Sequence, residues 1–153
     1  NMTVISFTFD KYNVERKKQL EVPINVENGM NITDVREENI PLSNGNKETV
    51  LRFHYEYKVD YKPNQAIIEI AGHLIYLPPK GDSKEILATW QKEKKLDKEI
   101  MQQVMNNILL RCQVKALALG QDLNLPPHIR LPSVTSGPAP KKEEKKKAAD
   151  YTG

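Results

Sequence analysis

In Leu51–Tyr61, whose sequence is LRFHYEYKVDY, apolar and polar side chains alternate at every position. The apolar positions are Leu51, Phe53, Tyr55, Tyr57, Val59 and Tyr61. A side-chain period of two over this length predicts a β-strand with one face in the core and the other in water. This strand has the cleanest alternation in the chain, and the other predicted elements are placed relative to it.

Two strand patterns precede this stretch. Residues 3–15 predict a first strand, because polar side chains alternate with Ile5, Phe7 and Phe9. A second pattern begins near residue 24, and its apolar positions are Ile24, Val26, Met30 and Ile32. Asn28-Gly29 interrupts the second pattern, as a β-bulge or a turn does.

One more strand pattern follows, at residues 66–77. Both of its faces are largely apolar, which predicts either a central strand or a contact between subunits. Turn residues separate the strands on both sides of the 51–61 stretch. Asn44-Gly45 predicts a hairpin turn within the loop 41–46, and Lys62-Pro63-Asn64 predicts a second turn.

Two helical patterns complete the ordered part of the chain. Asp82 and Glu85 have the spacing of a capping box, which predicts a short helix running to Lys95. A longer helix of roughly 23 residues is predicted between an N-cap at Asp97 and a C′ residue at Gly120. The sequence therefore predicts an α+β fold, in which a four-stranded antiparallel sheet is followed by a short and a long helix.

The long helix carries two apolar stripes. The main stripe contains Ile100, Met101, Val104, Met105, Ile108, Cys112, Ala116 and Leu119. The second stripe, which lies on another side of the helix, contains Leu110, Val114 and Leu117. A single sheet covers one stripe of a helix, so the second stripe predicts an oligomer interface.

A proline-containing segment, Leu123–Pro132, follows the long helix. Proline disfavours helix in the residue before it, so we expect an extended linker whose apolar side chains dock on another surface. Small residues, Pro, Lys and Glu dominate residues 133–153, where we expect a disordered tail. One domain is therefore expected at residues 3–132, followed by this tail.

Composition narrows the class of protein. The chain has a net charge of +3, and residues 133–153 contribute +2 of it, from five Lys and three acidic residues. Residues 1–132 are nearly neutral, which makes nucleic-acid binding unlikely except through a weak tether at the tail. No apolar run reaches the roughly 20 residues of a membrane helix, and we expect neither membrane insertion nor a signal peptide. One cysteine, Cys112, fits a cytoplasmic protein.

No set of residues has the spacing of a catalytic or metal site. His54, His73 and His128 are far apart in the sequence and have no Cys or carboxylate at metal-ligand spacing. Cys112 lies on the main stripe of the helix, where a buried, inert thiol is expected. We expect a protein that is not an enzyme and that uses no cofactor or metal.

Three segments carry a resemblance to a known family. They are Val4–Tyr12 (VISFTFDKY), Thr49–Phe53 (TVLRF) and Leu123–Pro127 (LNLPP). In this order, with a long helix before the last segment, they resemble SecB, the export chaperone. The sequence is similar to a distant, archaeal-type SecB-like protein over roughly residues 3–132.

The resemblance implies an ATP-independent holdase that assembles as a dimer of dimers. SecB proteins bind unfolded polypeptides in hydrophobic grooves formed by the sheet, its crossover loop and the linker after the long helix. Carried onto this chain, the resemblance implies client-binding positions at Ile24, Val26, Leu125, Ile129 and Leu131. The strand pattern itself adds Met30 and Ile32, although Met30 could equally be ordinary core.

Three functions follow as hypotheses. The first is a holdase for unfolded or nascent polypeptides, with a possible part in protein export, in a homotetramer or homodimer. The second is a dedicated partner protein, such as a SecB-like chaperone of one toxin–antitoxin pair or an assembly scaffold. The third is association with nucleic acid or the ribosome through the basic tail.

Overall fold

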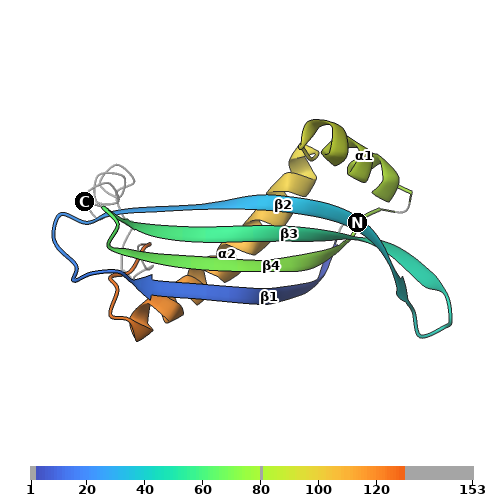
Figure 1. Ribbon diagram of the computed structural model, residues 1–153. Helices are drawn as coiled ribbons and strands as arrows, with labels where there is room; N and C mark the ends of the chain where they lie inside the picture. Colours follow the sequence, from blue (N-terminus) through green and yellow to red (C-terminus); the bar gives the residue numbers. More distant parts are fainter. Residues whose placement is uncertain (1–2, 80, 130–153) are drawn as a thin grey trace, which may run out of the picture.

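The computed structural model describes residues 3–79 and 81–129. Four antiparallel strands precede two helices, which confirms the predicted α+β class. The elements are β1 (Thr3–Arg16), β2 (Asn25–Pro41), β3 (Lys47–Lys62), β4 (Ala66–Leu77), α1 (Ser83–Glu93) and α2 (Lys98–Asp122). The long helix α2 crosses one face of the sheet, and α1 lies near the end of the sheet from which the β2–β3 hairpin projects (Figure 1).

The strand order in the sheet is β1-β4-β3-β2. β4 is therefore a central strand, which is one of the two predicted reasons for its apolar character on both faces. β1 and β2 form the two edges of the sheet. Residues 17–24 must cross from one edge to the other, because they connect β1 to β2.

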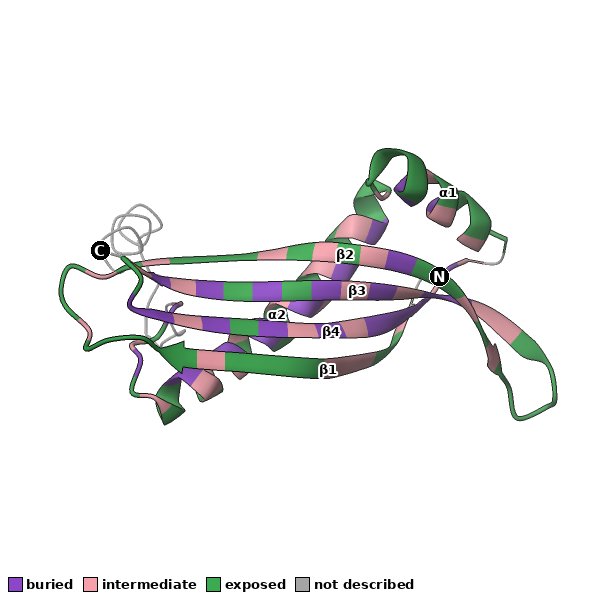
Figure 2. Ribbon diagram, viewed as in Figure 1, coloured by how far each residue is buried: buried purple, intermediate pink, exposed green. Residues whose placement is uncertain are grey.

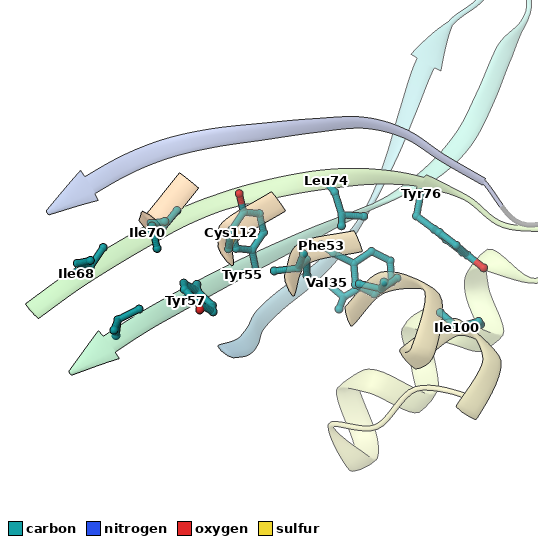
Figure 3. Close-up of a cluster of buried hydrophobic side chains, with 14 of the residues drawn as sticks. Val35, Phe53, Tyr55, Tyr57, Ile68, Ile70, Leu74, Tyr76, Ile100 and Cys112 are labelled. Carbon is teal, nitrogen blue, oxygen red and sulfur yellow. The ribbon is translucent and has the colours of Figure 1, made fainter. Parts of the chain in front are cut away.

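The alternation of β3 places its apolar face under α2. All six apolar residues of the 51–61 stretch are at most 1% exposed. The facing residues of α2 recur at every fourth position, and they are Ile100, Val104, Ile108, Cys112, Ala116 and Gly120. Figure 3 shows side chains from β3, β4 and α2 meeting in this core. Each fully buried aliphatic or aromatic side chain contributes roughly 1.5–3 kcal/mol, so this layer is the main source of stability.

Two bulges change the pattern predicted for β1. The register with β4 shifts between Val4 and Ser6 and again between Phe9 and Lys11. The helix-side positions, read from this register, are Val4, Phe7, Phe9, Tyr12 and Val14. Ile5, predicted to lie on the apolar face, occupies a bulge and is 44% exposed. An extra residue in a bulge moves every later side chain to the other face, which simple alternation does not predict.

The bulge predicted at Asn28-Gly29 is wrong. Asn28 pairs with Val59 and Gly29 with Lys58 in regular register, and the irregularity of β2 lies between Ile32 and Asp34. Asn28 lies on an edge strand, at a position where the alternation would place an apolar side chain. Its amide reaches water there. The polar residue therefore breaks the sequence pattern without breaking the strand.

The helix ends differ from the prediction in two places. Asp82 is the N-cap of α1, but its side chain makes no capping hydrogen bond, so the predicted capping box does not form. Asp97 caps α2 as predicted, accepting a hydrogen bond from the Glu99 backbone N–H at 3.3 Å. Gly120 is not the C′ residue, because α2 continues to Asp122. Gly120 is buried in the core-facing stripe instead, next to Ile68 and Leu125.

Candidate functional site

The linker after α2 is anchored to β3 through two tyrosine hydroxyls. Tyr61 Oη donates a hydrogen bond to the Pro126 carbonyl at 2.6 Å, and Tyr57 Oη lies 2.9 Å from His128 Nε2. Arg16 adds a third contact, from its Nη1 to the Leu123 carbonyl at 2.9 Å. The residues after α2 therefore run back along the sheet rather than away from it.

The docked linker lies beside the predicted apolar residues of β2. Val26 pairs with Tyr61 and Met30 pairs with Tyr57 in the β2–β3 ladder, so all four side chains point to the helix side. Ile24, Val26, Met30 and Ile32 pack against the edge of the core and remain half-buried. Figure 2 shows this edge strand as alternating intermediate and exposed residues. The edge of β2 thus combines accessible apolar side chains with backbone groups that no strand of the described residues pairs.

His128 is the buried polar group that holds the linker. It is 3% exposed, and burial lowers its pKa to about 4, so its imidazole is neutral at pH 7. Its Nδ1 has no hydrogen-bond partner within residues 3–79 and 81–129. The sequence analysis treated His128 only as a possible metal ligand. The apolar neighbours Pro127 and Ile129 were the available sign that it would be buried.

A groove of about 280 Å³ lies between the end of α2 and the linker. Its lining residues are Tyr61, Val114, Leu117, Ala118, Gly120, Gln121, Leu125, Pro126, Pro127 and His128. The structure therefore brings together two groups that the sequence analysis had kept apart, the linker and the second stripe of α2. Leu125 is buried against the core at 6% exposure, so in this subunit it contributes to the wall of the groove more than to accessible surface.

The segment that crosses the sheet is anchored by Gln65. The Gln65 carbonyl accepts a hydrogen bond from the Lys17 backbone N–H at 2.9 Å, and its Oε1 accepts one from the Glu21 N–H at 2.6 Å. The middle of the segment is open, since Val22 is 88% exposed. The sequence analysis missed this anchor because a glutamine beside a predicted turn gives no sign of burial.

The other client-binding positions are placed as follows. Ile129 is half-buried at the end of the described linker. Leu131 lies outside the described residues, as does the whole predicted tail. Met30 packs on the core but keeps part of its surface accessible. The accessible members of the predicted set are thus Ile24, which directly precedes β2, the β2 residues Val26, Met30 and Ile32, and Ile129, and we refer to these five as the β2–linker surface.

The second stripe of α2 is largely exposed. Leu110 is 67% exposed and Val114 is 61% exposed, whereas Leu117 is half-buried.

The double substitution Leu110→Asp with Val114→Asp is expected to lower the particle mass, because two charges would have to be buried in the contact. Sedimentation equilibrium measures this mass. An unchanged mass would show that the stripe is not an interface.

The sheet face away from α2 carries charged and histidine side chains. His73 Nδ1 lies 2.7 Å from Asp10 Oδ2, as expected for a hydrogen-bonded histidine, and the His54 ring centroid is 5.8 Å from that of His73. Burial, and then the nearby His73, lowers the pKa of His54. Within residues 3–79 and 81–129, no group of three or more His, Cys, Asp or Glu side chains is arranged to hold a metal.

Two acidic residues of β2 form ion pairs with arginines of the sheet. Asp34 pairs with Arg36, and Glu38 pairs with Arg52 through two hydrogen bonds of 2.7 and 3.1 Å. The Arg52 guanidinium lowers the pKa of Glu38. Because these carboxylates already have cationic partners on the strands, they offer little to the basic segment of another protein.

Cys112 is buried in the core, as its position on the main stripe predicted. Burial raises its pKa to about 12, so the thiol stays protonated and unreactive at neutral pH.

No helix among the described residues is both long and apolar enough to cross a membrane.

Comparison with known proteins gives one structural likeness. No protein-family model matches the chain, and no curated protein matches it. Among solved structures, it is similar to the Mycobacterium tuberculosis Rv1957 SecB-like chaperone in complex with a ChAD peptide from the Rv1956 HigA1 antitoxin. The chain is similar to a SecB-like protein. The TM-score is 0.47 and the sequence identity 10%, over 90% of this chain and 93% of that one.

Proposed function

We propose that this protein is an ATP-independent holdase that binds extended polypeptide along the β2–linker surface. The observation that carries the proposal is the coincidence of accessible apolar side chains and an unpaired strand edge on β2. An extended client could form backbone hydrogen bonds with this edge while its side chains contact Val26, Met30 and Ile129. Such a surface selects for apolar, unfolded segments and not for a particular sequence.

The expected binding is reversible. Full burial of one aliphatic side chain contributes roughly 1.5–3 kcal/mol, and the residues of the β2–linker surface are already half-buried. Several such contacts together therefore contribute only a few kcal/mol to the free energy of binding. The cost of ordering an unfolded segment offsets part of this contribution. A client held this weakly can leave without ATP.

The proposed activity is tested by suppression of aggregation. An unfolding client, such as heated citrate synthase, is followed by light scattering with and without an equimolar amount of the protein. We expect scattering to fall markedly, and addition of ATP to change nothing. Unchanged aggregation across a tenfold range of protein concentration would refute the holdase proposal.

The substitution Ile129→Asp is expected to weaken client binding by roughly tenfold, since a charge replaces an apolar contact worth about 1.4 kcal/mol. The particle mass should stay the same. Affinity is measured by fluorescence anisotropy of a labelled unfolded peptide. Leu42→Asp is the matched control, because Leu42 is exposed in the β2–β3 hairpin loop, outside the β2–linker surface. Equal losses in both variants would place the client elsewhere.

A dedicated partner is the second candidate function. The groove beside the linker favours it, because an enclosed space of about 280 Å³ with a buried imidazole suits one defined side chain better than many. Affinity capture from a lysate separates the two: a single stoichiometric partner supports this candidate, whereas a mixture of unfolded proteins supports the holdase. We place either function in the cytoplasm and in a homodimer or homotetramer, with protein export as one setting for the first.

A further inference from the structure

A second and larger groove lies at the opposite end of α2, between α1 and the first turn of α2. It encloses about 570 Å³. Its apolar lining is Ile86, Leu96 and Ile100. Its charged lining among the described residues is Asp82, Glu85, Glu93, Asp97 and Glu99, with Lys95 as the one cation of that set. Five carboxylates and one ammonium give a net charge of −4 around an apolar floor. We call this the acidic groove.

The carboxylates of the acidic groove are uncommitted. None of the five forms an ion pair within residues 3–79 and 81–129. Asp82 occupies the N-cap position of α1, but its carboxylate accepts no capping hydrogen bond from the helix, as described above. Only Asp97 uses its side chain, in the 3.3 Å bond to the Glu99 backbone N–H. The carboxylates that line the groove therefore have no ion-pair partner in the described chain, although Lys84, Lys92, Lys94 and Lys98 lie on the same helices and their connection.

A buried polar atom is influenced by three of these carboxylates. Tyr76 is fully buried, and its hydroxyl has no hydrogen-bond partner in the described part of the chain. Burial is the main cause that raises its pKa to about 12, and the charges of Asp97, Glu99 and Asp82 add to the rise. Figure 3 shows the Tyr76 ring pointing from β4 toward the helices, with its oxygen on the side of Ile100.

We propose that the acidic groove binds the chain's own lysine-rich segment, Lys141–Lys147. This segment has the sequence KKEEKKK and a net charge of +3, from five Lys and two Glu. It is the densest cationic run in the chain and complements a groove of charge −4. Lysine also fits the mixed lining, because its aliphatic stem can lie on Ile86 and Ile100 while its ammonium reaches the carboxylates.

The chain is long enough for this contact. His128 is bonded to Tyr57, and Tyr76 pairs with Leu51, six residues from Tyr57 on the same strand. At about 3.3 Å per residue, the linker anchor and the level of the groove are roughly 20 Å apart along the strand. The twelve Cα-to-Cα steps from Ile129 to Lys141 can span up to about 40 Å when the chain is extended. Because the linker runs back from the end of α2, it already points in the required direction.

The proposal is tested in the full-length chain with a spin label. Ala148→Cys places a nitroxide next to Lys147, and native Cys112 stays unlabelled because it is buried. We expect the amide NMR signals of α1 and the first turn of α2 to lose about half of their intensity, because a short tether holds the tail at a millimolar effective concentration. Salt at about 0.5 M should restore these signals by screening. Undiminished signals at low salt, or loss only at other elements, would overturn the proposal.

Two controls identify the groove and the source of the tail. Glu85→Gln, Glu93→Gln and Glu99→Gln together should restore the signals, whereas Glu15→Gln, Glu37→Gln and Glu56→Gln remove the same charge from exposed positions elsewhere and should not. Mixing labelled chains with isotope-enriched unlabelled chains tests for exchange between subunits. Signal loss only in the mixture would show that a second copy supplies the tail, and would refute binding within one chain. The outcome is independent of the proposed holdase activity, which involves the β2–linker surface.

Discussion

Replacing Gly72 with alanine is expected to destabilise the protein by about 3 kcal/mol or more, enough to unfold much of a domain of ordinary stability. A Cβ atom on Gly72 would lie 2.1 Å from the Thr8 carbonyl oxygen and 2.4 Å from the Tyr55 hydroxyl. Tyr55 Oη donates a hydrogen bond to that same carbonyl at 3.0 Å, passing over the glycine. The bond between β3 and β1 can form only because β4 has no side chain at this position.

Urea unfolding followed by circular dichroism measures the loss. Gly29→Ala is the matched control, because Gly29 also lies in a strand but has no atom within 4 Å of the added Cβ and no positive φ. That control should change stability by less than about 1 kcal/mol, in either direction. Adding Tyr55→Phe to Gly72→Ala should rescue only part of the loss, since the Thr8 carbonyl still blocks the methyl group. Similar stability of Gly72→Ala and the native chain would mean that β1 and β4 are not packed as described.

Acidification is expected to release the linker from the sheet. The pKa of His128 falls from an ordinary 6.5 to about 4 on docking, so the docked form takes up its proton less readily. The stabilisation is fully present above pH 6.5 and is lost progressively as the pH falls toward 4, where the released imidazole is protonated. A difference of about 2.5 pH units corresponds to a roughly 300-fold change in the docking equilibrium, or about 3 kcal/mol.

Histidine ring NMR signals measure this effect directly, because each imidazole titrates separately. We expect the His128 signal to titrate near pH 4 in the docked state, and the amide signals of the linker to shift with it. His128→Phe keeps the ring buried but cannot titrate, so its linker should remain docked at pH 5. A His128 pKa near 6.5, or the same acid response in His128→Phe, would contradict the assignment. Release should also expose more of Val26 and Met30, which links this prediction to client binding.

Both predictions involve residues whose importance the sequence pattern did not reveal. Gly72 lies within the predicted strand 66–77 and interrupts an apolar face there, but nothing in the sequence places it beneath Tyr55. His128 lies in a proline-rich segment, and its partner Tyr57 is 71 residues away. Contacts of this kind depend on how distant segments are brought together, and local periodicity carries no information about that distance.

The acidic groove also combines features that the sequence pattern predicts with an arrangement that only tertiary contacts decide. Asp82 and Glu85 were predicted to form a capping box, and Asp97 was predicted as the N-cap of the long helix. The capping box fails to form, and α1 folds back toward the first turn of α2. Residues predicted to serve two separate helix ends therefore line one groove. Packing of α1 against β2 and β3 produces this arrangement, and the helix signals alone do not predict it.

The sequence by itself determined the types of element and which face of each is apolar, because side-chain periods of two and of about four are local properties of the chain. It thereby determined the four strands, the two helices and the buried face of β3. Tertiary structure alone decided the strand order, the bulges of β1, the docking of the linker through Tyr57 and Tyr61, and the position of Gly120 inside α2. These features depend on contacts between segments far apart in sequence, where the space available and the partners of buried polar atoms choose among locally equivalent conformations.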